Sequence, residues 1–113
     1  MTNEFFLVYF DMRKKMRETE YRASRVCRIL GNPTAYQIIK LLMHSRDTPS
    51  GLAKKIGLSL PVISLTLKTL RNIDLVRYDT KGNEKMYSIK DETISHMCQV
   101  IERFVTRMRH KMW

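Results

Sequence analysis

The spacing of apolar residues changes over one short stretch of this chain, and that change limits the folds it can adopt. Before and after the stretch, apolar residues recur every three or four positions, as in amphipathic helices. Within it, the β-prone runs Leu75–Tyr78 and Lys85–Ile89 flank a turn signal at Thr80-Lys81-Gly82-Asn83. The pattern predicts a mainly α protein of the α+β class with a single β-hairpin.

Start and stop signals divide the helical part. Residues 4–30 lack glycine and proline, so we expect one or two helices that end at Gly31. Asn32 and Pro33 are typical of a helix start, and a short helix later ends at Gly57. We expect Ser59 to cap a third helix of about residues 59–72. Its apolar side carries Ile63, Leu67 and Leu70, and its opposite side carries Pro61, Leu65, Lys68 and Asn72.

Size and charge limit the function. The 113 residues predict one domain, and only 4 glycines and 3 prolines argue against a sandwich of many short strands. The 21 basic and 11 acidic residues give a net charge of +10, which favours a polyanionic partner, either nucleic acid or an anionic membrane surface. We find no nucleophile with a base at usable spacing and no phosphate-binding loop, so we do not expect an enzyme.

The ends of the chain and its two cysteines bear on its compartment. The apolar stretch Phe5–Phe10 is too short for a signal-peptide core or a membrane span, so we expect a reduced, cytoplasmic protein without a membrane partner. Cys27 and Cys98 are either small buried apolar residues or a redox or metal switch at a dimer interface. The Phe5–Phe10 cluster suits an interface, with an apolar effector site between the terminal helices as the alternative.

Three short helices followed by a hairpin with a basic tip is the order of a winged helix-turn-helix. Characteristic stretches between Leu30 and Ile89 are Gly31-Asn32-Pro33-Thr34, Ile38-Ile39-Lys40-Leu41-Leu42, Leu52-Ala53-Lys54-Lys55-Ile56-Gly57-Leu58-Ser59, Ile63-Ser64, Leu67-Lys68-Thr69-Leu70, Leu75-Val76, Gly82 and Tyr87-Ser88-Ile89. With them the segment resembles the ArsR/SmtB family of transcription regulators. The resemblance implies a sequence-specific DNA-binding regulator, most often a repressor.

Three departures from the family pattern matter. Asp74 stands where members often have glycine, and aspartate tolerates the left-handed conformation better than most residues. Metal-sensing members carry a Cys-x-Cys pair where this chain has Thr48-Pro49-Ser50-Gly51. Asp91, His96 and Cys98 do not have the spacing of the family's other metal site either. We therefore predict no metal site and no cofactor.

The resemblance and the charge pattern together indicate which residues contact duplex DNA. The third helix would enter the major groove, while lysines and arginines on the preceding helix and on the wing, about residues 75–89, would reach phosphates. Leu65 would meet thymine methyl groups, or would instead pack in the core or contact a partner. The predicted DNA-binding residues are Lys54, Lys55, Ser59, Pro61, Ser64, Leu65, Lys68, Thr69, Arg77, Lys81 and Lys85.

The terminal segments carry more apolar residues than a winged helix needs for its own core. We expect a single domain over 1–113 with a dimerisation segment at 1–30, a core at 32–90 and a second dimerisation helix at 91–113. The predicted homodimer interface comprises Phe5, Val8, Met12, Met16, Met97, Ile101, Phe104 and Met108. The alternative function is a winged-helix module that binds protein, which the apolar residues near position 60–65 favour.

Overall fold

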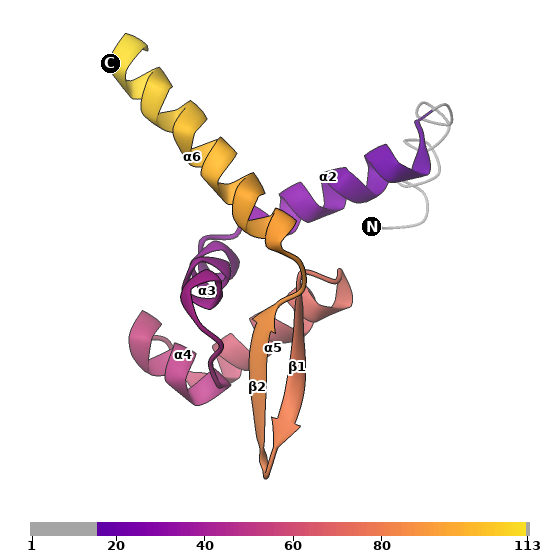
Figure 1. Ribbon diagram of the computed structural model, residues 1–113, viewed down its shortest axis with the longest axis vertical. Helices are drawn as coiled ribbons and strands as arrows, with labels where there is room; N and C mark the ends of the chain where they lie inside the picture. The colour runs from indigo at the N-terminus through magenta and orange to yellow at the C-terminus, as the bar shows by residue number, and fades with distance from the viewer. Residues whose placement is uncertain (1–15, 113) are drawn as a thin grey trace.

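The structure, a computed structural model, describes residues 16–112, with side chains up to Arg109. Its elements are helices α2 (Glu18–Leu30), α3 (Pro33–His44), α4 (Pro49–Ile56) and α5 (Leu60–Asn72), strands β1 (Val76–Lys81) and β2 (Glu84–Ile89), and helix α6 (Glu92–Met112). Figure 1 shows α3, α4 and α5 grouped beside the hairpin, while α2 and α6 extend away from this body in different directions. The predicted winged helix-turn-helix, in the α+β class, is confirmed.

Side-chain caps fix where three of the helices begin. Asn32 accepts a hydrogen bond from the Ala35 backbone N–H at 3.0 Å, and Pro33 occupies the first turn of α3, as predicted. Thr48 caps α4 in the same way, accepting from the backbone N–H of Gly51 at 3.0 Å. Asp91 precedes α6 and accepts from the Thr93 N–H at 2.7 Å.

The predicted cap at Ser59 is only half right. Ser59 stands at the N-cap position of α5, yet its side chain makes no capping hydrogen bond. A capping hydroxyl normally accepts from the second or third residue of the helix. The second residue of α5 is Pro61, which has no N–H, so one of these two donors is missing.

The core lies where α3, α4 and α5 meet the hairpin. Its fully buried residues on α5 are the three predicted ones, Ile63, Leu67 and Leu70. The other members are Leu30, Ala35, Ile38, Ile39, Leu42, Leu52, Leu75, Val76, Tyr87, Ile94 and Cys98. Ile94 and Cys98 attach the first two turns of α6 to this core, so the rest of α6 is held by other contacts. The buried role predicted for the cysteines is right for Cys98 and wrong for Cys27, which is exposed.

The hairpin is longer than the sequence predicts and its turn is shorter. Thr80 pairs with Lys85 and Lys81 pairs with Glu84, which leaves Gly82 and Asn83 as a two-residue turn. Gly82 adopts a φ of 65°, a conformation that costs glycine little. Asp74, between α5 and β1, has a φ of 63°, as expected from its place in the family pattern.

Asp47 joins the loop before α4 to the wing, where the sequence predicts only a loop. Its backbone N–H donates to the Tyr87 carbonyl at 3.1 Å, and its carbonyl accepts from the Tyr87 N–H at 2.8 Å. Its carboxylate accepts from the Thr48 N–H at 2.7 Å and lies 2.8 Å from the Lys55 ammonium. Gly51 lies against this carboxylate, and a Cβ there would be 2.8 Å from Asp47 Cγ. Asp47 and Gly51 together therefore couple the helix-turn-helix to the wing.

Replacing Gly51 by alanine is expected to destabilise the protein by about 1–2 kcal/mol, although alanine favours a helix, because the new methyl group displaces the Asp47 carboxylate from its partners. Urea unfolding of Gly51→Ala measures the loss. In an Asp47→Ala background the obstacle is gone, so the same substitution should stabilise by roughly 0.5–1 kcal/mol. The same sign of the effect in both backgrounds would contradict this account.

Candidate nucleic-acid interface

Helix α5 turns one face to the core and the other to the outside. The helix-turn-helix consists of α4, a turn in which Gly57 has a φ of 84°, and α5. On the outer face Pro61, Ser64 and Lys68 are exposed, and the Leu65 side chain is 67% exposed. Leu65 therefore has no core role in this chain, and contact with DNA or with a partner are the two roles left for it. The outer face combines hydroxyl, ammonium and apolar groups, a mixture that suits base edges and phosphates.

The hydroxyl groups of α5 are not equally available. Thr69 is half-buried, and its hydroxyl donates to the Leu65 carbonyl at 3.2 Å. Thr66 donates to the Val62 carbonyl at 2.8 Å in the same manner. Ser59 and Ser64 are exposed, and neither side chain is hydrogen-bonded to any part of the chain that the structure describes. Of the predicted contacts, the two serines thus have hydroxyls free for a ligand, whereas the Thr69 proton is already used.

Tyr78 of the wing lies between two cations. The Lys85 ammonium is 4.8 Å from the centre of its ring, and the Arg71 guanidinium carbon is 5.2 Å from it. Such cation–π contacts hold long basic side chains in place without neutralising their charge. Arg71 is at the end of α5, so the cluster joins the recognition helix to the wing. Arg71 is not among the predicted DNA-binding residues, because its position beside Tyr78 depends on how α5 packs against β1.

The other predicted basic residues differ in their partners. Lys54, Lys68, Arg77 and Lys81 are exposed, and none forms an ion pair within residues 16–109. Lys55 is exposed too, but its ammonium pairs with Asp47 at 2.8 Å. A phosphate would have to compete with that carboxylate, so Lys55 is a weaker candidate than Lys54.

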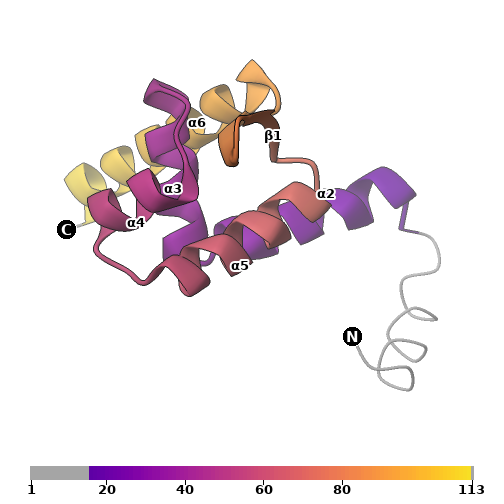
Figure 2. The same ribbon diagram turned by 90° about the horizontal axis from the view of Figure 1, so that it is seen from below.

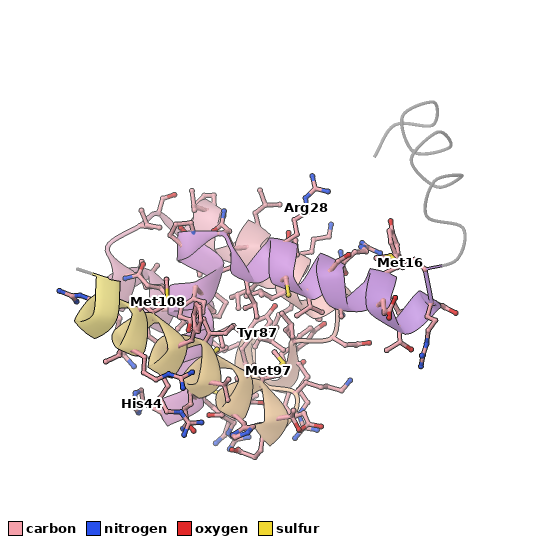
Figure 3. The ribbon with its side chains drawn as sticks, turned by 90° about the horizontal axis from the view of Figure 1, so that it is seen from above. Met16, Arg28, His44, Tyr87, Met97 and Met108 are labelled. Carbon is pink, nitrogen blue, oxygen red and sulfur yellow. The ribbon has the colours of Figure 1, made fainter. Side chains whose placement is uncertain are left out.

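Helices α2 and α6 leave an apolar groove between them. Its volume is about 710 Å³, and its lining includes Ala23, Val26, Cys27, Leu30, Tyr36, His96, Met97, Val100 and Ile101. Figure 3 shows the two helices across the upper face with Met97 between them, and with Met16 and Met108 at opposite ends. Beyond the groove, α6 carries Phe104, which is 53% exposed, and Val105. This face has the composition of an interface.

The predicted interface residues fall into three groups. Ile101 and Phe104 are exposed on α6, and Met16 is exposed just before α2. Met97 and Met108 are half-buried. Phe5, Val8 and Met12 lie outside the described residues. Two exposed residues of α6 are not in the predicted set. Val100, which is 45% exposed, lies off the apolar stripe of the helix, whereas Val105 lies on it.

Glu102 attaches the middle of α6 to α3. Its carboxylate accepts from the Tyr36 hydroxyl at 2.6 Å and from the Lys40 ammonium at 2.9 Å. These two hydrogen bonds lower the pKa of the Glu102 carboxyl below its ordinary value. Burial, followed by the bond to Glu102, raises the pKa of the Tyr36 hydroxyl. The contact between the middle of α6 and α3 is therefore made by an ionised Glu102.

Because folding lowers the pKa of the Glu102 carboxyl, its ionised form stabilises the folded protein above the ordinary glutamate pKa of about 4.3. This stabilisation is lost as the pH falls through the lower pKa of the folded state. The group is partly exposed, so the contribution is at most about 1 kcal/mol. We expect Glu102→Gln to reduce the free energy of unfolding at pH 7 but not near pH 3, measured by urea titration. Glu20→Gln, an exposed control, should show no such difference; a Glu102 effect independent of pH would contradict the assignment.

A membrane span and a metal site are two alternative roles. No helix between residues 16 and 112 is long and apolar enough to cross a membrane. Over the described part of the chain, no three His, Cys, Asp or Glu residues gather where they could hold a metal ion.

An exposed helix after a tight turn, with a basic hairpin beside it, defines a winged helix-turn-helix of the DNA-binding class. Residues 32–78, from the cap of α3 into β1, match the model of the bacterial regulatory protein arsR family. This match confirms the resemblance found in the sequence to ArsR/SmtB-like winged helix-turn-helix regulators. The matching family and the fold are those of transcription regulators and not of enzymes, as predicted.

Individual relatives agree with this class. The HTH-type transcriptional regulator NmtR of Mycobacterium tuberculosis is 28% identical over 81 residues, which are 72% of this chain and 65% of NmtR. The match thus spans just under two thirds of NmtR.

Solved structures show the same fold. The homodimeric winged helix-turn-helix DNA-binding domain of Mb0332 from Mycobacterium bovis has a TM-score of 0.77 at 22% identity, covering 89% of this chain and 93% of that one. The transcriptional repressor BigR from Xylella fastidiosa has a TM-score of 0.67 at 16% identity, covering 85% and 95%.

Proposed function

We propose that this protein is a homodimeric, sequence-specific DNA-binding repressor. The observation that carries the proposal is the exposed outer face of α5 beside a basic wing, with Arg71 of α5 and Lys85 of the wing both packed on Tyr78. Helix α5 enters the major groove, and the wing lies along the sugar-phosphate backbone. Repression follows when the bound dimer covers a promoter; the family match and the repressor role of BigR support this part. A protein with this function works in the cytoplasm.

Base reading in this proposal depends on few side chains. Ser64 and Lys68 supply hydrogen bonds to base edges, and Leu65 supplies an apolar contact to thymine methyl groups. The centre of the outer face has no arginine, asparagine or glutamine for bidentate recognition. Part of the specificity therefore comes from DNA shape and deformability.

Dimerisation in this proposal uses α2 and α6. The exposed apolar residues on α6 and the groove beside α2 offer a surface that a second copy can cover, and such a surface is rarely left in water. Each square ångström of apolar area covered contributes about 25 cal/mol. The homodimeric state of the Mb0332 domain supports a dimer of this chain. Two-fold symmetry then presents two α5 helices to half-sites about one helical turn apart. The domain thus divides into terminal dimerisation helices around a core of residues 32–90.

One observation favours a second function, a winged-helix module that binds another protein. Leu58, Leu60, Val62 and Leu65 are all exposed at the N-terminal end of α5. An apolar cluster of this kind suits a protein partner better than a phosphate backbone. The two functions differ in whether a duplex binds at all.

Selection of duplexes from a random library, followed by titration of the selected operator, tests the proposal. The double variant Lys81→Ala/Lys85→Ala is expected to weaken binding to the operator and to unrelated duplexes by the same factor, because its contacts are to phosphates. Lys68→Ala should cost about 1–3 kcal/mol on the operator and less elsewhere, because it removes a base contact. Failure to select any duplex would favour the protein-binding module.

A further inference from the structure

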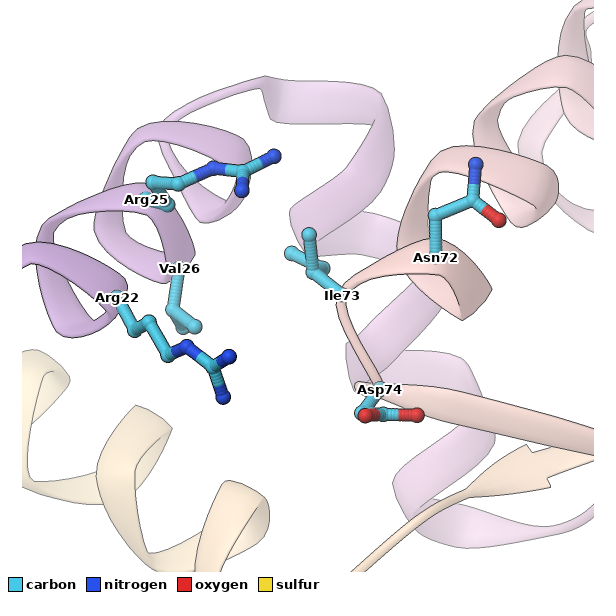
Figure 4. A pocket seen from close by; sticks show the side chains of 6 residues that line it. All are labelled: Arg22, Arg25, Val26, Asn72, Ile73 and Asp74. Atoms are coloured by element: carbon cyan, nitrogen blue, oxygen red, sulfur yellow. The ribbon is translucent and has the colours of Figure 1, made fainter. Parts of the chain in front are cut away.

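A small polar recess lies where α2 passes the C-terminal end of α5. Its volume is about 250 Å³, and Figure 4 shows the guanidinium groups of α2 facing the end of α5 across it. The lining residues are Arg22, Arg25, Val26, Asn72, Ile73 and Asp74. None of them is among the predicted DNA contacts.

The two arginines are oriented by the packing of α2. Arg22 and Arg25 are three residues apart, so they share one side of the helix with Ile29, which packs against the core. That side faces the body of the protein, which directs both guanidinium groups toward the end of α5.

The charges around the recess leave it basic. Arg25 forms no ion pair with any residue of the described range. Arg22 pairs with Glu18 at 3.1 Å, but both side chains are about three-quarters exposed, so the pair is weak. Asp74 adds a carboxylate whose exposed pair with the Lys90 ammonium, at 3.6 Å, is weak as well, so the two arginines outnumber one acidic group among the lining residues. The recess therefore suits an anion.

The recess continues the outer face of α5. Asn72 is four residues after Lys68 and seven after Leu65, so all three lie on one stripe of the helix. Figure 2 shows α5 running toward α2, which extends beyond its C-terminal end. A duplex that lies along α5 thus meets the recess at the end of this stripe.

We propose that Arg22 and Arg25, with the Asn72 amide, bind a phosphate of the DNA backbone next to the bases that α5 reads. This inference rests on the proposed function. Guanidinium groups match phosphate oxygens in a bidentate geometry, and the amide adds a donor. The contact fixes the position of α5 along the duplex without reading bases. Because α2 belongs to the proposed dimer interface, this phosphate lies on the side of each half-site that faces the centre of the operator.

The test compares Arg22→Gln/Arg25→Gln with Arg103→Gln/Arg107→Gln, which removes the same charge from exposed positions on α6. Affinity for the selected operator is measured by fluorescence anisotropy at several salt concentrations, with the dimeric state checked by light scattering. The first variant should lower the slope of log K against log salt by about 0.9 for each phosphate lost. The second should keep the wild-type slope. Equal slopes for the two variants would overturn the inference and leave the proposed function intact. A wild-type protein that binds no duplex would overturn both.

A second variant works in the opposite direction. Glu18→Gln removes the carboxylate that competes for Arg22 and is expected to tighten binding to the operator. Glu20→Gln, on the same helix but on another side of it, changes the charge equally. Equal tightening by the two variants would mean a general charge effect and would contradict a contact through Arg22.

Discussion

Replacing Ile101 by aspartate is expected to dissociate the dimer and to abolish binding to the operator. Ile101 is 46% exposed on α6 and lines the groove beside α2, where the proposed partner copy would cover it. An unpaired charge in a covered apolar surface costs several kcal/mol, enough to lower the dimer affinity by a factor of roughly 10²–10³. Monomers then lose the joint binding of two half-sites, so both effects should occur together.

Light scattering and operator titration measure the two effects on the same samples. Gln99→Asp is the matched control, because it adds the same charge two residues away, at an exposed position on a different side of α6. The control should stay dimeric and bind the operator normally. A wild-type protein that is monomeric at micromolar concentration and still binds tightly would refute the dimer proposal.

Raising the salt concentration from about 50 to 200 mM is expected to weaken operator binding by a factor of roughly 10³–10⁵. Lys54, Lys68, Arg77, Lys81 and Lys85 are exposed on or beside the proposed DNA-binding surface, and none is paired with a carboxylate of residues 16–109. Two copies of this set make on the order of six to ten phosphate contacts, each of which releases counterions on binding. Anisotropy titrations at fixed temperature give the slope. Binding that is insensitive to salt would exclude this surface as the site of contact.

The elements that local patterns determine are the ones that the sequence predicts well. The cap of Asn32 on α3, the buried stripe of α5 and the left-handed Asp74 each depend on a few neighbouring residues. The pairing of Asp47 with Tyr87 links positions 40 residues apart, so no local pattern reveals it. Pro61 already indicates a weaker cap at Ser59, because proline removes one of the two N–H donors that a capping side chain uses.

The same distinction holds for the candidate site. The outward side of α5 follows from helical spacing, and the structure confirms that Pro61, Leu65 and Lys68 are exposed there. The availability of each group does not follow from spacing. The pairing of Lys55 with Asp47 and the packing of Arg71 and Lys85 against Tyr78 depend on the tertiary fold. Helical spacing therefore predicts which side chains of α5 are exposed. The tertiary contacts show which basic groups are already paired.

Helix α6 has a mechanical consequence beyond its apolar surface. Ile94, Cys98 and Glu102 attach only its first half to the body, and its 21 residues extend over about 30 Å. The second half of α6 therefore extends about 15 Å beyond the last of these attachments. A tilt of about 10° at Glu102 moves the far end by roughly 3 Å over this length. In the proposed dimer, an event that loosens the bond between Glu102 and Tyr36 would thereby change the separation of the two α5 helices.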